Sequence, residues 1–287
     1  MWSKFEYEKP DTLEEALDLL SEHGTEAVLY AGGTDVLVSM REGEIKPKYL
    51  VDIKGIRELS KIKLENGHLN LGPLVTWSAL INSDSLPGRL DIFREAAKVF
   101  ASPQVRNAAT VGGNICTASP SCDMGPVLLV LDTELEVVGK EGKRTVPIGD
   151  FFKGRKQTSL AKDEILTGIR VKIPSESTGT AFLKRRRTGV DLAIVNVAVA
   201  VEAKKGVFEN VKIALGGVAP TPMRAAKAEE ELRGVACSDE NVKNAAQTAS
   251  WETSPIGDVR ASAEYRREVS RVLVRRAIEV ALEKIGG

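Results

Sequence analysis

The chain has 287 residues, of which 43% are hydrophobic and 28% are charged, and this composition is typical of a globular protein rather than a disordered one. Its 40 basic and 40 acidic residues leave a formal net charge of zero, so the overall charge favours neither nucleic acid nor an anionic membrane as a partner. Because no apolar run approaches the ~18 residues of a membrane-spanning helix and the charged N-terminus lacks the apolar segment of a secretion signal, we expect a cytoplasmic protein with no membrane span and no nucleic-acid partner.

The first fifty-odd residues have the pattern of a small α/β unit. Asp11 and Glu14 resemble a capping box, and apolar residues at helical spacing follow until Gly24. The apolar run at residues 27–30 then predicts a buried strand, and residues 48–53 predict a second one.

Between residues 59 and 174 the pattern changes to short strands with helices between them. Helices are predicted in the segment TWSALINS, with Thr76 as its N-cap, and in the amphipathic residues 91–101. Strands are predicted at residues 69–71, 127–130, 135–138 and 165–173. We expect an antiparallel sheet with helices beside it.

The segment PSESTGT at residues 174–180 is small and polar, which predicts a linker and a domain boundary near Ser175. Two β-rich runs follow, joined by a turn at Lys204, Lys205 and Gly206. The chain then ends in a helical segment that includes RRAIEVALEKIGG.

Two glycine pairs lie in similar surroundings, in AGGTD at residues 31–35 and in TVGGN at residues 110–114. Successive glycine peptides can direct several backbone N–H groups at one point and so bind phosphate oxygens. Two such turns that face each other would bind a pyrophosphate from both sides. Neither has the spacing of a Rossmann or P-loop motif, so a dinucleotide would need a different architecture, and an ordinary tight turn stays an alternative at each site.

Side chains for hydrolytic or metal chemistry are scarce. Cys116, Cys122 and Cys237 form no Cys-x-x-Cys pair, and their odd number favours reduced thiols over a disulfide framework. His23 and His68 belong to no Ser/His/Asp, Cys/His or His-Glu-x-x-His arrangement. We therefore predict no metal site and no catalytic residue, and any redox chemistry would come from a cofactor.

Taken together, AGGTD, RNAATVGGNICTASPSCD at residues 106–123, ALGGVAPTPMRA at residues 214–225 and ASAEYRREV at residues 261–269 resemble the FAD-binding medium subunit of the molybdenum hydroxylases, the carbon monoxide dehydrogenase and xanthine dehydrogenase family. The likeness covers essentially the whole chain. It implies an α+β fold. A vanillyl-alcohol-oxidase-like (PCMH-type) FAD-binding domain of two α/β subdomains would occupy residues 1–174, divided into about 1–56 and 57–174. A C-terminal α/β domain with a small antiparallel sheet and helices would occupy residues 178–287.

The resemblance also implies which residues contact FAD. The two glycine turns would bind its pyrophosphate through Leu29, Tyr30, Ala31, Gly32, Gly33, Thr34, Asp35 and Val36, and through Thr110, Val111, Gly112, Gly113 and Asn114. The other implied contacts are Phe100 with a ring, Asp123 on the adenosine side, Leu166 from a strand, Lys184 as a basic contact and Leu192 as an apolar residue against the isoalloxazine.

Several of these positions have a simpler interpretation. Phe100 on the apolar face of its helix would serve equally as core, Asp123 as a cap, and Lys184 as part of a solvated charge run. The helix that begins in SAEYRREV is expected to turn inward Val269, Val272, Leu273, Ala277 and Val280. Its outer face, either solvated or covered by a partner subunit, would consist of Arg266, Arg267, Arg271, Arg275 and Arg276.

The function implied by the resemblance is electron transfer. The chain would be the FAD-binding subunit of a molybdenum-containing hydroxylase, with the molybdenum-pterin cofactor on a large partner subunit and [2Fe-2S] clusters on a small one, assembled as a dimer of heterotrimers. No inserted cysteine loop is present, so no iron–sulfur cluster is expected in this chain. Two alternatives are a self-sufficient FAD-dependent oxidoreductase of the same fold and a flavin-free assembly or nucleotide-binding subunit.

Overall fold

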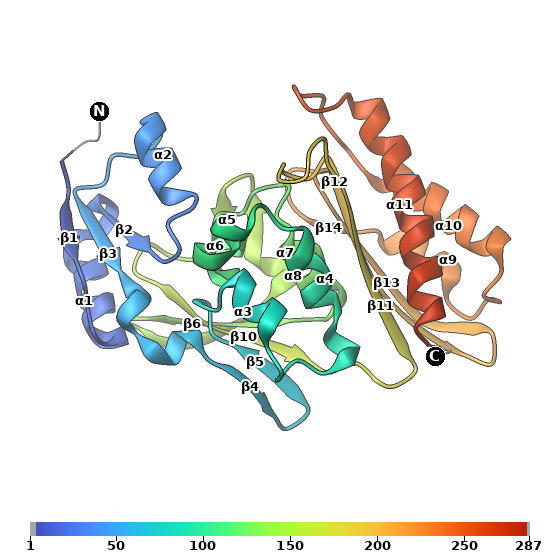
Figure 1. Cartoon of the computed structure of the whole chain (residues 1–287), viewed down its shortest axis with the longest axis horizontal. Coiled ribbons are helices and arrows are strands. Elements are labelled where there is room, and N and C mark those ends of the chain that lie inside the picture. Colours follow the sequence, from blue (N-terminus) through green and yellow to red (C-terminus); the bar gives the residue numbers. More distant parts are fainter. Residues whose placement is uncertain (1–3, 286–287) are drawn as a thin grey trace.

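The computed structural model describes residues 4–285, and in it the chain is organised around three main sheets arranged along the long axis of the molecule (Figure 1). The N-terminal unit lies at one end, the central unit follows it, and the C-terminal unit with the long helix α11 lies at the other end. The last two residues of the predicted helical tail, Gly286 and Gly287, lie outside the described residues. Within residues 4–285, no helix combines the length and the apolar character needed to cross a membrane.

The N-terminal unit is a parallel sheet in the order β1-β3-β2, with two helices. Its strands are β1 (Glu6–Glu8), β2 (Ala27–Tyr30) and β3 (Tyr49–Asp52), and its helices are α1 (Leu13–His23) and α2 (Val36–Glu42). Both predicted strands and the first helix are confirmed in position, but β2, which was expected to be buried, is only half-buried at all four residues. The capping box is one residue later than predicted, because Thr12 accepts the N–H of Glu15 and the Glu15 carboxylate accepts the N–H of Thr12.

The central unit is an antiparallel sheet in the order β4-β5-β10-β6-β7. Its strands are β4 (Ile62–Glu65), β5 (His68–Leu71), β6 (Glu134–Gly139), β7 (Gly142–Pro147) and β10 (Ile165–Lys172). A separate small hairpin pairs β8 (Phe152–Gly154) with β9 (Gln157–Thr158). The strands predicted at residues 69–71, 135–138 and 165–173 are therefore confirmed within one residue or two at their ends.

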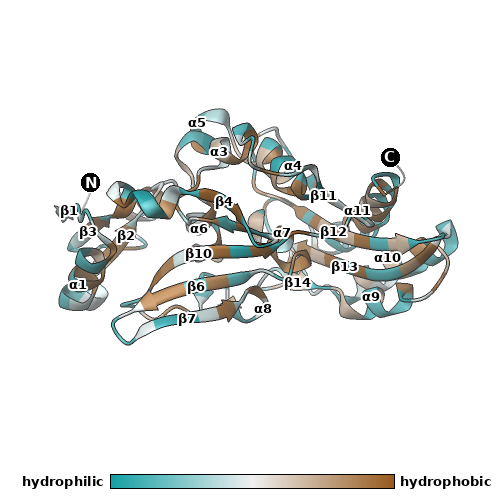
Figure 2. Ribbon diagram, turned by 90° about the horizontal axis from the view of Figure 1, so that it is seen from below, coloured by the Kyte–Doolittle hydropathy of each residue, from teal (hydrophilic) through white to brown (hydrophobic). Residues whose placement is uncertain are grey.

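Helices of the central unit lie beside this sheet (Figure 2). They are α3 (Trp77–Asn82), α4 (Ile92–Val99), α5 (Pro103–Ala108), α6 (Val111–Cys116), α7 (Met124–Val130) and α8 (Ile148–Phe151). Thr76 is the N-cap of α3, as predicted, and accepts the N–H of Ala79. The strand predicted at residues 127–130 is wrong, because these residues are helical in α7. All of α7 is buried, and an apolar run without a polar face has no periodicity to separate a helix from a strand.

The C-terminal unit is an antiparallel sheet in the order β11-β12-β13-β14. Its elements are β11 (Thr178–Arg185), β12 (Val195–Lys204), β13 (Val207–Gly216), β14 (Met223–Arg224), α9 (Ala226–Leu232), α10 (Asp239–Glu252) and α11 (Ala263–Glu283). The two β-rich runs and their turn at Lys205 and Gly206 are confirmed, with positive φ angles at both turn residues. The predicted linker is shorter than expected, because β11 already begins at Thr178.

Both faces of this sheet are buried, which explains why β12 is apolar at nearly every position. Val197 and Val199 face the helices α9, α10 and α11 in one core, whereas Ala198 and Ala200 belong to the core of the central unit. The central and C-terminal units therefore share a continuous core. On α11, Leu273 and Ala277 are buried as predicted, but Arg266 is only 4% exposed, so its predicted place on the outer face is wrong.

Candidate functional site

Two adjoining cavities lie where the three units meet. The smaller, of about 260 Å³, is bounded by the first glycine turn, α6 and β10, and the larger, of about 680 Å³, by the loop after α6 and by loops of the C-terminal unit. The residues that line both are Thr34, Asp35, Phe100, Asn114 and Thr117. The two cavities therefore meet at the first glycine turn and Phe100, and an extended ligand could pass from one to the other.

The first glycine turn connects β2 to α2 and presents unused backbone donors. Gly33 has φ +74°, a left-handed conformation that favours glycine, and a Cβ on Gly32 would lie 2.2 Å from the carbonyl oxygen of Ala108. Within residues 4–285, no acceptor bonds the backbone N–H groups of Gly32, Gly33, Thr34 or Asp35. Several amides in one tight turn, directed at a cavity, are the chemistry that binds phosphate oxygens.

The second glycine pair does not form the expected turn, because Gly112 and Gly113 lie within helix α6, although the fold brings this pair beside the first turn. Thr110 caps α6, and the N–H of Gly113 donates to the Thr110 hydroxyl at 3.0 Å. The N–H of Gly112 donates to the carbonyl of Pro73 at 2.9 Å, and a Cβ on Gly112 would lie 2.4 Å from the Pro73 side chain. The second glycine pair therefore serves close packing, and its amides are already bonded. Of the two nests that the sequence suggested, only the first has donors to offer.

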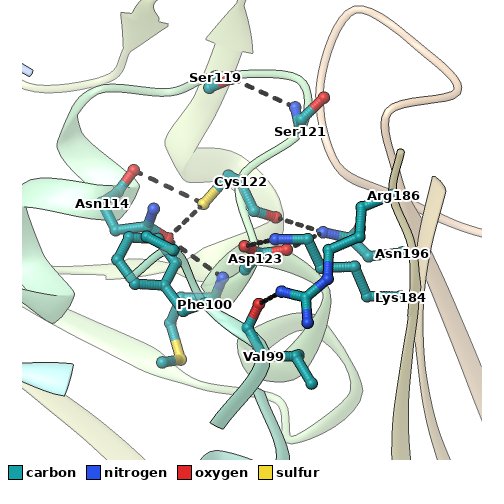
Figure 3. A network of polar contacts seen from close by, with 12 residues as sticks. Val99, Phe100, Asn114, Ser119, Ser121, Cys122, Asp123, Lys184, Arg186 and Asn196 are labelled. Atoms are coloured by element: carbon teal, nitrogen blue, oxygen red, sulfur yellow. Dashed lines mark hydrogen bonds and ion pairs between the residues drawn. The ribbon is translucent and has the colours of Figure 1, made fainter. Parts of the chain in front are cut away.

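Asn114, directly after the second glycine pair, supplies a side chain to both cavities. Its Oδ1 accepts the Sγ–H of Cys122 at 3.0 Å and the N–H of Met124 at 3.1 Å (Figure 3). These bonds fix the orientation of the amide and leave its Nδ2 without an acceptor among the described residues. This N–H₂ group is a further donor at the point where the cavities meet.

Phe100 lies at the same junction and stacks on Trp77. The ring centroids are 3.9 Å apart and the ring planes differ by 3°. Phe100 follows the last residue of α4, and its carbonyl accepts Nη1 of Arg106 at 2.8 Å, so backbone and ring are both held. One face of Phe100 is covered by Trp77, and the residue also lines both cavities, which suits contact with a planar ring.

Asp123 and Lys184 form a buried ion pair on the wall of the larger cavity (Figure 3). The Lys184 Nζ lies 2.6 Å from Asp123 Oδ2, and Asn196 Nδ2 lies 2.7 Å from Oδ1. Next to them, the Arg186 guanidinium donates to the carbonyl of Val99. The two residues predicted as separate ligand contacts are therefore partners of each other, one from the loop before α7 and one from β11.

The predicted site residues are largely brought together. Those that line the smaller cavity are Leu29, Ala31, Gly32, Gly33, Thr34, Asp35, Val36, Phe100, Thr110, Gly112, Gly113, Asn114 and Leu166. Asp123, Lys184 and Leu192 line the larger one. Tyr30 and Val111 line neither; the Tyr30 ring lies where a Cβ on Gly33 would be, and Val111 is fully buried in the central core.

The structure adds residues that sequence reasoning missed. Thr117 lines both cavities, and its hydroxyl lies 2.9 Å from the carbonyl oxygen of Gly113 and 3.3 Å from the Asp35 carboxylate. Lys156, beside β9, reaches Glu44 near the end of α2 at 2.7 Å, across a separation of 112 residues. Asp258 and Arg266 come from the loop before α11 and from α11 itself. Only Arg266 had a sequence signal, the SAEYRREV segment, and the helical pattern assigned it to the wrong face.

The carboxylates that line the larger cavity all have hydrogen-bond donors. Asp123 has Lys184, Asp191 has Arg187 at 3.0 Å, and Asp258 has Arg260 and Arg266. Desolvation by surrounding protein raises the pKa of Asp35, and the Thr117 hydroxyl and Lys156 oppose this rise. Three of the four carboxylates are thus paired with cationic side chains, which suits structural roles better than the role of a general base.

Thiol chemistry is equally disfavoured at this site. Burial raises the pKa of both Cys116 and Cys122 to about 12, so the thiols stay protonated at neutral pH. All three cysteines are free in the described structure. Among residues 4–285 there is no group of three or more His, Cys, Asp or Glu side chains placed to hold a metal ion.

The sequence matches two protein families over consecutive parts of the chain. Residues 3–175 match the family described as "FAD binding domain in molybdopterin dehydrogenase", and residues 180–281 match the "CO dehydrogenase flavoprotein C-terminal domain". The chain is 34% identical to the carbon monoxide dehydrogenase medium chain of Hydrogenophaga pseudoflava, with 97% of each chain covered. It is 32% identical to the xanthine dehydrogenase FAD-binding subunit of Escherichia coli O157:H7, with 98% of this chain and 97% of that subunit covered.

Solved structures give the same result for the fold. A chain of carbon monoxide dehydrogenase from Hydrogenophaga pseudoflava superposes with a TM-score of 0.97 at 35% identity, with 99% of each chain covered. A chain of quinoline 2-oxidoreductase from Pseudomonas putida 86 superposes with a TM-score of 0.94 at 26% identity, covering 99% of this chain and 98% of that one. The expected fold is thereby confirmed, and the chain belongs to the family of FAD-binding medium subunits of molybdenum hydroxylases.

Proposed function

We propose that this chain binds FAD across the two adjoining cavities and passes electrons between the [2Fe-2S] clusters of a partner subunit and a terminal acceptor, as part of a molybdenum-containing hydroxylase. The observation that carries the proposal is the first glycine turn. Its unbonded amides at residues 32–35 border a cavity that also offers an aromatic ring and a side-chain amide. These are donors for a diphosphate and a surface for a flat ring, which are the two parts of a flavin dinucleotide.

The residues present fit such a ligand. The amides of the first turn would hold the pyrophosphate, with Thr110 and Asn114 on the opposite wall of the smaller cavity. Gly33 fits the requirement for a turn without a side chain, because its φ angle is positive and a Cβ there would meet the Tyr30 ring at 2.3 Å. In this proposal Phe100 and Leu166 contact the cofactor directly. Asp123 and Lys184 act as a bonded pair that shapes the larger cavity, in which Leu192 is the apolar wall.

The cofactor supplies the redox chemistry when it is bound, and the side chains of this chain bind it, orient it and set its surroundings. A self-sufficient oxidoreductase would also need a free acid or base near the ring. Of the four carboxylates that line the larger cavity, Asp123, Asp191 and Asp258 are instead engaged with Lys184, Arg187 and Arg266, and Asp35 lies 3.3 Å from the Thr117 hydroxyl. This engagement favours electron transfer over turnover of an organic substrate on this chain.

The assembly and the domain division are further parts of the proposal. The large molybdenum subunit and the small [2Fe-2S] subunit are the partners, two such heterotrimers associate, and the complex works in the cytoplasm, where free thiols persist. Residues 1–174 act as the FAD-binding domain, with subdomains divided at about residue 56, and residues 178–287 act as the C-terminal domain. The names of the relatives support the subunit roles, since they are medium chains or FAD-binding subunits of larger enzymes.

The test is to express the chain alone and together with a large molybdenum subunit and a small [2Fe-2S] subunit from the same organism, and to purify each preparation through this chain. We expect a yellow protein with equimolar FAD and, in the complex, iron and molybdenum that copurify. A substrate of the molybdenum subunit should bleach the flavin absorption only in the complex. A colourless chain that refuses FAD on reconstitution would support the flavin-free alternative, and oxidation of an organic substrate by the isolated chain would support the self-sufficient one.

A further inference from the structure

Arg266 is a buried cation near the start of α11, in the segment SAEYRREV. Its side chain is 4% exposed, whereas the next residue, Arg267, is exposed. A buried guanidinium is costly unless its donors are bonded. The Nε of Arg266 has no acceptor in the described structure, but Nη1 and Nη2 are both bonded, and their acceptors indicate the role of the side chain.

The partners of Arg266 come from three segments that are distant in sequence. Its Nη1 donates to the carbonyl of Ile194 and, at 3.0 Å, to the carbonyl of Gly217, and its Nη2 lies 2.8 Å from Asp258 Oδ1. Ile194 ends the irregular segment 186–194 that leads into β12, Gly217 begins the turn after β13, and Asp258 belongs to the loop before α11. One planar cation therefore joins three loops at a single point.

The glycine pair in ALGGVAPTPMRA, Gly216 and Gly217, lies at the same junction. Gly217 has φ +78°, and a Cβ there would lie 2.7 Å from the Ile194 carbonyl oxygen and 3.5 Å from Arg266 Nη1. Its own N–H donates at 2.7 Å to the carbonyl of Pro120, in the loop of the central unit that leads to Asp123. The glycine allows the loop around Pro120, the segment 186–194 and the guanidinium to approach one another closely.

This junction forms one wall of the larger cavity. Arg266, Gly217 and Asp258 line that cavity together with Leu192 and Ile256, which are half or more exposed and belong to two of the joined loops. Leu192 lies two residues before Ile194, whose carbonyl Arg266 holds. With no strand or helix of its own, the segment 186–194 depends on such bonds for a fixed position.

We propose that Arg266 is a positioning residue that anchors the segment 186–194, and so fixes Leu192 on the wall of the cavity where, if the function proposed above holds, the isoalloxazine of FAD is bound. Arginine is required because its planar fork reaches the Ile194, Gly217 and Asp258 oxygens at once, which a lysine ammonium on a flexible stem does not. In this role Arg266 needs no contact with the cofactor.

The test compares Arg266→Met and Arg266→Lys with Arg267→Met, a matched control one residue away on the exposed side of α11. The first measurement is limited trypsin digestion of the full chain without flavin, because Arg186 and Arg187 place cleavage points within the segment. We expect both Arg266 variants to be cut there about tenfold faster than the control and the wild type. Equal cleavage rates in all four proteins would overturn the anchoring role.

The second measurement is FAD binding, with the midpoint potential and visible spectrum of the bound flavin. We expect the dissociation constant to rise about tenfold in both Arg266 variants, equivalent to about 1.4 kcal/mol, with a displaced potential. Wild-type spectrum, potential and affinity in the Arg266 variants would overturn the effect on Leu192. If Arg266→Met fails to fold, Arg266→Lys, which keeps the charge and most of the stem, decides both outcomes.

The two proposals fail in different ways. If the wild-type chain binds no FAD, the proposed function fails, and the digestion still decides whether Arg266 anchors the segment. If the wild type binds FAD and the Arg266 variants match Arg267→Met in every measurement, only the positioning role is overturned.

Discussion

Lys184 and Asp123 form a salt bridge of 2.6 Å in which both side chains are only 2% exposed, and it joins β11 to the loop before α7. The pair connects the C-terminal unit to the central unit directly at the larger cavity. Asn196 from β12 binds the second carboxylate oxygen, so the carboxylate is bonded on both sides. Because burial strips both charges of water, each one depends on its partner.

Removal of either partner should therefore be strongly destabilising. Asp123→Ala leaves a buried ammonium and Lys184→Met a buried carboxylate, and each change should lower the free energy of unfolding by about 3–5 kcal/mol. The free energy of unfolding of the double variant should fall by less than the sum of the two single losses. Urea denaturation of the four proteins measures this.

The exposed pair Arg187–Asp191 serves as the control for that comparison. Its side chains are 49% and 25% exposed, so Arg187→Met should cost less than about 1 kcal/mol. If the single variants of Asp123 and Lys184 lose no more free energy of unfolding than this control, the two buried charges do not depend on each other.

The two glycine pairs should respond differently to the same small side chain. Gly33→Ala forces a residue with a Cβ into a positive φ and against the Tyr30 ring, so we expect FAD binding to weaken at least tenfold and stability to fall by about 1–3 kcal/mol. In Gly113→Ala the new Cβ lies in helix α6, where alanine is favoured, but 2.9 Å from the Thr110 hydroxyl, which must shift and so weaken its cap bond to the N–H of residue 113. We expect the free energy of unfolding to fall by about 1 kcal/mol and FAD binding to weaken less than in Gly33→Ala. Equal losses of bound FAD in the two variants, measured by flavin fluorescence, would show that the two pairs act alike.

Trp77 should influence FAD binding although it lies beneath Phe100. Trp77→Leu removes the ring that stacks on Phe100, an interaction that contributes about 0.5–1.5 kcal/mol beyond the area it buries. Without this ring Phe100 can tilt, so we expect FAD binding to weaken two- to tenfold. Trp77→Phe keeps a ring and removes an indole N–H that has no acceptor in the described structure, so its effect should be small.

Trp251, which is 69% exposed, provides the comparison for Trp77. Trp251→Leu should leave the dissociation constant of FAD unchanged in the same titration. An unchanged dissociation constant in Trp77→Leu would mean that Phe100 holds its place without the stack.

Much of the site could be predicted because its residues are local in sequence. The AGGTD and TVGGN segments carry their own turn and capping signals, and the structure places both beside one cavity. The sequence could not show which backbone amides remain unbonded. The N–H of Gly112, for example, donates to the carbonyl of Pro73, in a segment about forty residues away. The same holds for the partnership of Asp123 with Lys184, 61 residues apart, which depends on how β11 packs beside α4 and brings Lys184 to the loop before α7.

The fold errors have physical causes of the same kind. Helix α7 is enclosed by the C-terminal sheet and by neighbouring helices of the central unit, so its apolar run carries no periodic signal. Arg266 follows the helical pattern of a solvent-facing arginine, and only the carbonyls of Ile194 and Gly217, brought in by other loops, make an inward position favourable. Sequence patterns thus located the helices and strands, whereas contacts between distant loops determined which polar groups are hydrogen-bonded within the protein and which are free.

Asp258 should make the stability of the chain depend on pH in the acid range. Burial alone would raise the pKa of Asp258, but the backbone N–H of Arg260 and the guanidinium of Arg266 outweigh it and lower the pKa to about 2. Since the pKa is about 3.9 in the unfolded chain, the carboxylate stabilises the fold above about pH 4, and this stabilisation is lost as the pH falls towards 2. The Asp258 side chain is 30% exposed, so solvent screens its interactions, and we expect the ionised carboxylate to stabilise the fold by about 1 kcal/mol. We therefore expect the free energy of unfolding of Asp258→Asn, measured by urea denaturation at pH 7, to be about 1 kcal/mol below that of the wild type. This difference should become smaller below pH 4. A constant difference from pH 7 to pH 3 would show that the charge on Asp258 contributes nothing to the junction at Arg266.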